Sequence, residues 1–508
     1  MISPVFFRLA YVTAFLLVSL SCAQQFIRYP YLQQGTPESA IICWRYSEPE
    51  AFSIKYGTSP DNLNMMSGPS EASKDACLTL DDSTIIPYTK YYYKFVQKDT
   101  LVDFELEQFF VTHPSPGQTG EYTFWVVGDG GDASRAIYEN SKQFKLANGG
   151  SYAADGILFL GDNAYDDGTD AQFTSKFFGV FAEALSVNFS WSTIGNHENL
   201  TKDAAPYHAA FVHPTKGESG GIPSNTEYYY SFDYGNIHFI SLDSEQSARS
   251  IGGPMYTWLE KDLKATKQDW IITYFHHPPY SFGSHNSDKE SNLYQMRENF
   301  VPLLEDYGVD AVYTGHSHAY ERSFYIDRAY GNSKSNFENK DSVVLDPGSG
   351  DPDGTGAYRK SSMINPHEGT VYIVTGSASK LSASGSLHPM MYVKHIKYGT
   401  VILTVNDTVL TSRFIDRTGA QLDQFQIVKN RLEVNVERSK FKTDDLLING
   451  RGFSFPKNNS KLFRLYKTDG TLVYKGVPKG VWIANKSDVP NDVYIYRYGE
   501  THRKVSLF

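Results

Sequence analysis

The feature that most constrains this chain is a repeated pattern: five times, an apolar, strand-like stretch ends and a side chain able to bind a metal follows at once. The side chains concerned are Asp129, Asp162, Asn196, His276, His316 and His318. Glycine stands directly before four of them, which lets the backbone turn sharply and approach other groups closely. In α/β sheets, ligands bind beyond the carboxyl ends of the strands, so residues far apart in the sequence can meet there. The pattern therefore predicts an α/β layer structure with a metal site at its strand ends.

The types of donor and their spacing indicate what this site can hold. All six side chains offer oxygen or nitrogen, and none offers sulfur. His316 and His318 lie two residues apart in an extended segment, so they project to the same side and can bind adjacent metals. Taken alone, Asp129 after a glycine indicates no more than a turn or a helix cap. The conjunction of all six, in this order, indicates a metal site.

Four motifs around these residues resemble those of the calcineurin-like metallophosphoesterases and, within them, the purple acid phosphatases. The motifs are Gly128-Asp129-Gly130-Gly131, Gly161-Asp162-Asn163-Ala164-Tyr165, Gly195-Asn196-His197-Glu198 and Gly315-His316-Ser317-His318-Ala319-Tyr320-Glu321-Arg322. His276 stands in its expected place between the third and the fourth. The resemblance covers about Glu121 to Val428 and implies a four-layer αββα metallophosphoesterase sandwich.

The resemblance also implies two metal ions that share one carboxylate. By that likeness the first metal takes Asp129, Asp162, Tyr165 and His318, and the second takes Asp162, Asn196, His276 and His316. Asp162 is expected to bridge, because its two oxygens can each face one cation. The phenolate of Tyr165 is a hard, electron-rich ligand that favours Fe(III), whereas the other site suits Zn, Fe(II) or Mn. The alternative for Tyr165 is an aromatic ring packed beneath the loop.

Three histidines and two further charged residues are expected to assist catalysis. Two adjacent metals can lower the pKa of bound water, supply hydroxide as the nucleophile and clamp the phosphoryl oxygens. The leaving alkoxide then needs a proton, and the candidates for this role are His197, His277 and His285. The likeness favours His285 as the general acid and His197 as a phosphate-orienting residue, although a surface-loop histidine stays open for His285. Glu198 and Arg322 are expected to position the ligands, or else to form ordinary ion pairs.

The N-terminus is predicted to be an export signal over residues 1–23. Arg8 precedes an apolar stretch from Leu9 to Leu20, which is too short to span a bilayer and suits a signal-peptide core. The small residues Ser21-Cys22-Ala23 fit cleavage after Ala23, with a lipid anchor on Cys22 as the alternative. No later apolar run in the sequence approaches membrane-spanning length. We therefore expect a secreted or cell-surface protein, extracellular or periplasmic, without a transmembrane anchor.

Three folded domains are expected after this signal. Residues 24–113 show short alternating strands, and Ile85 to Tyr91 resembles the tyrosine corner of fibronectin type III-like domains, with a tyrosine packed in a hairpin as the alternative. Residues 120–430 form the expected catalytic domain, in which 331–369 is predicted to be a long loop that shapes specificity. Residues 431–508 are expected to form a small β-domain. It resembles the sorting domains read by the type IX secretion machinery, with an accessory β-domain as the alternative.

Cysteine content and charge complete the predictions. Once the signal is removed, Cys43 and Cys77 remain, and an oxidising compartment allows them to pair, although two free buried thiols stay open. The net charge is −10 and no long run of Lys or Arg occurs, so nucleic acid binding is not expected. The resulting hypothesis is a secreted acid phosphatase that acts on phosphate monoesters. A neutral phosphodiesterase or nucleotidase on the same fold, and a surface-binding protein with an inactive site, are the alternatives.

Overall fold

The structure is a computed structural model of the protein. It describes residues 25–361, 364–382 and 385–430, together with segments of the tail. The described tail segments are 447–449, 452–455, 462–467, 471–478, 480–483, 492–498 and 501–507. The chain forms two compact units that divide after Arg431. The expected export signal, with Cys22, lies outside the described residues. None of the described helices combines the length and the hydropathy that crossing a membrane requires.

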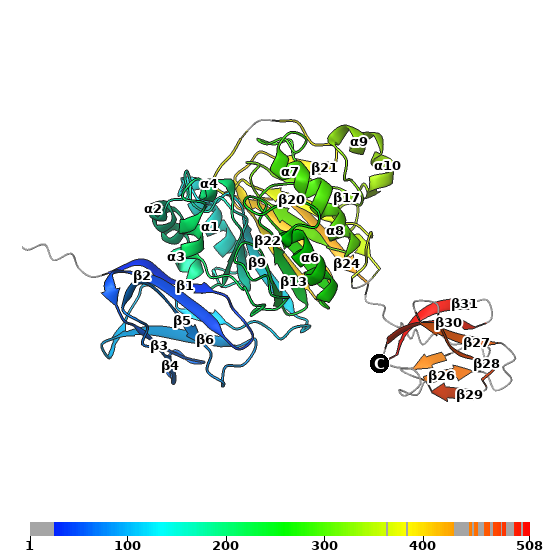
Figure 1. Ribbon diagram of the computed structural model, residues 1–508, viewed down its shortest axis with the longest axis horizontal. Helices are drawn as coiled ribbons and strands as arrows, with labels where there is room; N and C mark the ends of the chain where they lie inside the picture. The colour runs from blue at the N-terminus through cyan, green and yellow to red at the C-terminus, as the bar shows by residue number, and fades with distance from the viewer. Residues whose placement is uncertain are drawn as a thin grey trace, which may run out of the picture. The chain divides into compact units, whose positions relative to one another are not determined.

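The first strands form the expected all-β sandwich (Figure 1). One sheet holds β1 (Phe26–Gln33), β2 (Ala40–Glu50) and β5 (Ser73–Leu80). The other holds β3 (Ser53–Gly57), β4 (Met65–Ser67), β6 (Lys90–Gln97), β7 (Thr100–Val102) and β8 (Phe109–Val111). Trp44 of the first sheet and Phe95 of the second meet edge to face, with ring centroids 4.9 Å apart. Large buried aromatic rings therefore supply much of this core.

Two local features stabilise the sandwich. Cys43 on β2 and Cys77 on β5 are cross-strand partners and form a disulfide. The backbone N–H of Ile86 donates to the Tyr91 hydroxyl at 3.0 Å, which is the upstream contact expected of a tyrosine corner. The sequence left open whether the two cysteines are bonded or are free thiols, and in the structure they are bonded.

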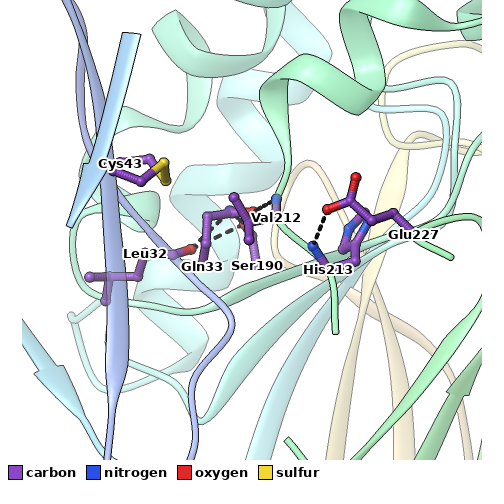
Figure 2. Close-up of a disulfide and its surroundings, with 8 residues drawn as sticks. Leu32, Gln33, Cys43, Ser190, Val212, His213 and Glu227 are labelled. Atoms are coloured by element: carbon purple, nitrogen blue, oxygen red, sulfur yellow. Dashed lines mark hydrogen bonds between the residues drawn. A yellow bond between two sulfur atoms is a disulfide. The ribbon is translucent and has the colours of Figure 1, made fainter. Parts of the chain in front are cut away.

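The sandwich and the following α/β part belong to one compact unit, and polar side chains of β1 bond across to that part. Buried Gln33 donates to the Ser190 hydroxyl at 2.5 Å and accepts from the backbone N–H of Val212 at 3.0 Å (Figure 2). Arg28, also buried, pairs with Asp170 at 2.6 Å.

Two seven-stranded sheets make up the centre of the α/β part of the chain, which follows the sandwich (Figure 1). The first has the order β11-β10-β9-β22-β23-β24-β19, formed by β9 (Glu121–Val127), β10 (Gly156–Phe159), β11 (Ser190–Ser192), β19 (Tyr358–Lys360), β22 (Gly399–Asn406), β23 (Val409–Asp416) and β24 (Gln421–Lys429). The second has the order β12-β13-β14-β15-β20-β16-β21, formed by β12 (Tyr230–Tyr234), β13 (Ile237–Ser241), β14 (Trp270–Tyr274), β15 (Ala311–Thr314), β16 (Tyr320–Ser323), β20 (Val371–Thr375) and β21 (Met391–His395).

Alternating strand residues bury the two faces of each sheet in different cores. In β9, Phe124 and Val126 belong to a cluster that both sheets share, whereas Trp125 and Val127 pack into the outer cluster beneath the helices. Across the shared core, Phe124 meets Phe239 with ring centroids 4.6 Å apart. Burial on both faces explains why these strands are continuous apolar runs in the sequence.

Helices cover the outer face of each sheet. The first sheet packs against α1 (Arg135–Ala147), the π-helical η1 (Phe173–Phe178) and α3 (Gly179–Leu185). The second packs against α6 (Pro254–Ala265), the π-helical η2 (Met296–Phe300) and α8 (Val301–Asp306). Other short helices are α2 (Asp170–Gln172), α4 (Asn196–Asn199), α5 (Ala205–Ala210) and α7 (Ser291–Gln295). The predicted four-layer αββα sandwich is confirmed.

The segment 331–369 is more structured than the long loop that its Gly, Ser, Asn and Asp content predicted. It contains α9 (Ser333–Glu338), α10 (Lys340–Val343) and β18 (Val344–Asp346), which pairs with β17 (Tyr325–Ile326). The Asn332 side chain caps α9 by accepting from the Ser335 N–H at 2.9 Å. Further along the segment, β19 pairs with β24 at the edge of the first sheet, and its residue Tyr358 is buried. Asn332 therefore serves here as a helix cap rather than as a loop residue.

The second unit, residues 432–508, is β-structured in its described segments. One sheet holds β25 (Leu447–Asn449), β26 (Gly452–Phe455) and β29 (Gly480–Ile483). The other holds β27 (Phe463–Lys467), β28 (Leu472–Gly476), β30 (Asp492–Tyr498) and β31 (Thr501–Leu507). Phe455, Phe463, Leu465 and Tyr496 are buried. The expected small β-domain is confirmed as a fold.

Candidate metal centre

The candidate donors follow the carboxyl ends of strands in two different sheets. Asp129, Asp162 and Asn196 follow β9, β10 and β11 of the first sheet, whereas His276 and the His316–His318 pair follow β14 and β15 of the second. The strands that carry donors run parallel within each sheet, so their carboxyl ends share one rim. The two sheets pack together, and the donors meet where their rims adjoin.

Three of the donors have left-handed backbone conformations. The φ angles are 56° at Asp129, 54° at Asp162 and 64° at His316. Non-glycine residues rarely adopt this region, which costs on the order of 1 kcal/mol or more per residue. The adjoining glycines leave no room for a larger residue, since a Cβ on Gly315 would lie 2.4 Å from an Asp129 carboxylate oxygen. Backbone strain and close packing thus hold the donors in place.

The first group of donors gathers around the hydroxyl of Tyr165. This oxygen lies 3.0 Å from Asp129 Oδ1, 2.8 Å from Asp162 Oδ2 and 3.4 Å from His318 Nε2. Tyr165 is buried, so its hydroxyl points into the cluster rather than toward solvent. The structure brings together the four residues expected at the first metal.

The second group gathers around the amide oxygen of Asn196. This oxygen lies 3.1 Å from His276 Nε2 and 2.9 Å from His316 Nδ1, and the two ring nitrogens are 3.2 Å apart. His276 Nε2 is also 3.4 Å from Asp162 Oδ1. Asp162 therefore directs one oxygen to each group, which is the geometry that a bridging carboxylate needs.

Groups behind the donors set their orientation. His276 Nδ1–H donates to the Leu160 carbonyl at 2.8 Å, which leaves the lone pair of Nε2 directed into the cluster. The buried Glu198 carboxylate accepts four backbone N–H groups, which belong to Asp162, Asn163, Ala164 and Gly195, at 2.7 to 3.1 Å. Glu198 thereby ties the loop after β10 to the loop after β11.

The electrostatics of the protein groups favour a bound cation. Burial opposes the charge of Asp162, but His276 outweighs it and holds the pKa of this carboxyl well below its usual range. Burial and the carboxylates of Asp129 and Asp162 raise the pKa of Tyr165 well above 10. A phenolate beside two carboxylates forms only when a cation offsets their repulsion. Oxygen and nitrogen donors that include a tyrosine suit the Fe(III) and Zn, Fe(II) or Mn pair expected here.

Comparison with known proteins identifies the domain that holds this cluster. The family model of the calcineurin-like phosphoesterases matches residues 122–320, which include every candidate donor. The chain carries a calcineurin-like phosphoesterase domain. The predicted resemblance to the calcineurin-like metallophosphoesterases is confirmed.

Relatives of this phosphoesterase domain include plant purple acid phosphatases. The chain is 32% identical over 249 residues to a purple acid phosphatase of Glycine max, which covers 46% of this chain and 50% of that protein. It is 30% identical over 248 residues to the Fe(3+)-Zn(2+) purple acid phosphatase 12 of Arabidopsis thaliana, with 46% and 50% covered. The chain spans about half the length of the curated relatives it matches.

A solved structure shows the same fold. The purple acid phosphatase isolated from yellow lupin (Lupinus luteus) seeds aligns with a TM-score of 0.60 at 20% identity, covering 80% of this chain and 75% of that chain. At this identity the likeness concerns the fold alone. It extends beyond the phosphoesterase domain, since 80% of the chain exceeds the 122–320 match.

His285 lies beside the second group of donors in the phosphoesterase domain. Its ring centroid is 3.7 Å from that of His316, and its Nδ1 is 2.8 Å from Glu290 Oε2. The same Glu290 oxygen is 3.5 Å from His316 Nε2. Burial raises the pKa of Glu290, but His316, the Asn286 N–H and His285 outweigh it and lower this pKa to about 2. Sequence reasoning missed Glu290, whose single signal was its position five residues after His285.

His197 and His277 occupy contrasting environments. His197 is partly exposed, bonds the Asp166 carbonyl through Nδ1, and has its Nε2 3.9 Å from Asp162 Oδ2. His277 is buried, and its Nδ1 lies 2.9 Å from the Ser244 hydroxyl. Burial and the neighbouring His316 and His276 lower the pKa of His277 well below 6.5. A neutral buried ring is poorly suited to donate a proton to a leaving group.

Arg322 does not contribute to the donor cluster as the sequence led us to expect. Its guanidinium forms a two-pronged ion pair with Asp423 at 2.6 and 2.8 Å and bonds the Tyr358 hydroxyl at 3.2 Å. These contacts join β16 of the second sheet to β24 and β19 of the first. The alternative of an ordinary ion pair is correct, and Arg322 holds the two sheets together.

Proposed function

We propose that this protein is a dinuclear metal phosphatase that hydrolyses phosphate monoesters at acidic pH. The observation that carries the proposal is the position of Asp162, whose two oxygens face two separate donor groups. Asp129, Tyr165 and His318 complete the first metal site, which is proposed for Fe(III). Asn196, His276 and His316 complete the second, proposed for Zn, Fe(II) or Mn. The name of the Arabidopsis relative, an Fe(3+)-Zn(2+) purple acid phosphatase, supports this pair.

The proposed reaction uses protein groups on both sides of the substrate phosphate. When bound, the two metals supply a hydroxide nucleophile and hold the phosphoryl oxygens for in-line displacement. His285, oriented by Glu290 at Nδ1, donates a proton from Nε2 to the leaving oxygen. His197, oriented by the Asp166 carbonyl, directs its Nε2 toward the phosphate. Glu198 keeps the Asp162 and Asn196 loops together while the substrate binds.

We also infer that the protein acts outside the cytoplasm. The Cys43–Cys77 disulfide supports an oxidising compartment, and the sequence of residues 1–23 supports export. The domain limits proposed for the mature chain are 24–113, 120–430 and 431–508. A role for the last of these in secretion rests on its resemblance to sorting domains.

The test is the rate of aryl phosphomonoester hydrolysis against pH, measured for the purified mature protein and for the His316→Ala variant. Turnover that peaks at acidic pH and disappears in the variant would support the proposal, because His316 is proposed to bind the second metal. Turnover confined to neutral or alkaline pH, or seen with diesters or nucleotides instead, would favour the phosphodiesterase or nucleotidase alternative. A purified protein without metals and without any hydrolase activity would favour the binding protein.

A further inference from the structure

The segment that follows β20 lies against the backbone of the first donor group. The backbone N–H groups of Ala378 and Ser379 donate to the carbonyls of Gly128 and Asp129, both at 3.2 Å. The N–H of Ser382 donates to the His318 carbonyl at 3.0 Å. This segment is therefore attached to two of the residues that surround the Tyr165 hydroxyl.

Lys380 extends from this segment over the ring of Tyr165. Its ammonium nitrogen lies 4.4 Å from the centroid of that ring. Two carboxylates hold it there, with Asp132 Oδ2 at 3.7 Å and Asp166 Oδ1 at 3.6 Å. The Lys380 side chain is 30% exposed, so water screens it only in part. Its position follows from the contacts of the segment and from the ion pairs together.

An ammonium group over an aromatic ring acts on the π electrons of that ring. The attraction is electrostatic, and it grows as the ring becomes richer in electrons and as water is excluded. A phenolate is richer in electrons than a phenol, and the Tyr165 ring is buried. Lys380 is thus placed to act on the electrons that a Tyr165 phenolate would share with a metal.

We propose that Lys380 is a positioning residue that tunes the bond between Tyr165 and iron by lowering the energy of the phenolate electrons. This inference rests on the proposed function, in which Tyr165 binds Fe(III). Visible absorption of such a site moves an electron from phenolate to Fe(III), so a cation over the ring raises the energy of the transition. The same cation stabilises the centre after it gains an electron. Lys380 therefore favours a shorter absorption wavelength and a higher reduction potential.

The experiment measures the visible spectrum and the Fe(III)/Fe(II) reduction potential of the iron-loaded full-length protein and of three variants. Lys380→Met removes the charge with little change in length and should move the absorption band to longer wavelength and lower the potential. Lys380→Arg keeps a cation over the ring and should leave both values close to those of the wild type. Lys145→Met is the matched control, because Lys145 lies 4.6 Å from the centroid of the Tyr152 ring, outside the donor cluster. It should change neither value.

The outcomes separate this inference from the function on which it rests. An iron-loaded wild type without a visible band would overturn the Tyr165–iron assignment and, with it, the role of Lys380. A wild-type band that does not move in Lys380→Met would overturn the role of Lys380 alone. A shift in Lys380→Arg as large as that in Lys380→Met would also overturn it, since a packing change would then explain both. If Lys380→Met fails to retain iron, Lys380→Gln takes its place with the same expected shifts.

Discussion

At the scale of single residues, Asp162 is the side chain whose loss should affect the most groups at once. It contacts Tyr165 through one oxygen and faces His276 through the other. We expect Asp162→Ala to abolish turnover and to lose both metals, because each proposed site loses a ligand and the repulsion between the cations is no longer offset. Metal content measured by elemental analysis tests this. Asp167→Ala, an exposed carboxylate of the same loop, should keep its metals, and a metal-replete Asp162→Ala would refute the bridging role.

A second residue-scale prediction concerns the leaving group. General acid catalysis contributes roughly 10²- to 10⁴-fold, and this contribution matters most when the leaving alkoxide is basic. His285→Ala should therefore slow alkyl phosphates by about 10²-fold or more, and aryl phosphates with good leaving groups far less. The comparison of kcat for the two substrate classes is the measurement. His367, another partly exposed histidine held by carboxylates, serves as the control, since its alanine variant should affect both classes equally. Equal losses in His285→Ala would remove His285 as the acid.

At the scale of elements, buried His238 links two strands of the second sheet to a helix that packs on that sheet. From β13, its ring bonds Asp233 of β12 at 2.7 Å and Asp262 of α6 at 2.9 Å. Burial opposes the imidazolium, but Asp262 and Asp233 outweigh it and raise the pKa of His238 to about 10. The Asp262 carboxylate also accepts from the Ser231 hydroxyl, and Asp233 accepts from Gln268. A charged histidine thus holds α6 against the sheet edge.

The raised pKa of His238 predicts how stability depends on pH. A group whose pKa is higher in the folded state binds its proton more tightly there, so its contribution is complete below the unfolded value of about 6.5. The contribution is lost as pH rises from about 6.5 through about 10. We expect His238→Gln to lower the free energy of unfolding by about 3–5 kcal/mol at pH 6. Denaturant unfolding at pH 6 and at pH 10 should show this difference shrinking, and a constant difference would contradict the assignment.

At the scale of the whole molecule, the chain divides into two compact units after Arg431. The three hydrophobic clusters of the first unit draw on residues from Tyr31 to Ile427, and every candidate donor lies within that range. Lys429 pairs with Asp310 at 2.7 Å, and the Asn430 N–H donates to the Lys360 carbonyl. These contacts close the first unit just before the division after Arg431.

We therefore expect a variant that ends at Asn430 to keep its metals, its turnover and its thermal unfolding midpoint. The reason is that no buried cluster of the first unit includes a residue of 432–508 in the part of the chain that the structure describes. Calorimetry and the aryl phosphate assay are the measurements. The amount of protein outside the cell should fall if the tail directs secretion. A lowered midpoint or a loss of metal on truncation would show that the tail supports the first unit.

Several features were predictable from the sequence because they depend on short stretches of chain. Each donor lies within four residues of the end of a strand, so the strand pattern and the donor after it appear together in the sequence. The same locality made the β-sandwich and an α/β layer structure predictable, whereas the four αββα layers were implied by the resemblance to the metallophosphoesterases. The prediction for 331–369 was wrong because Asn332 caps a helix and Tyr358 joins a distant strand, and neither contact is visible in local composition.

The sequence by itself determined which side chains are available for metal binding and in which order they occur. This is because the end of a strand can be predicted from a short stretch of neighbouring residues. Only the tertiary structure decided which other side chains contact these metal-binding candidates. Glu290 joins His285 to His316, Arg322 joins the two sheets rather than the donors, and Lys380 lies over Tyr165. These contacts connect residues from separate strands and loops. Which residues meet in this way depends on how the two sheets pack and on the path of each connecting segment. The pattern of residues along the chain does not contain this information.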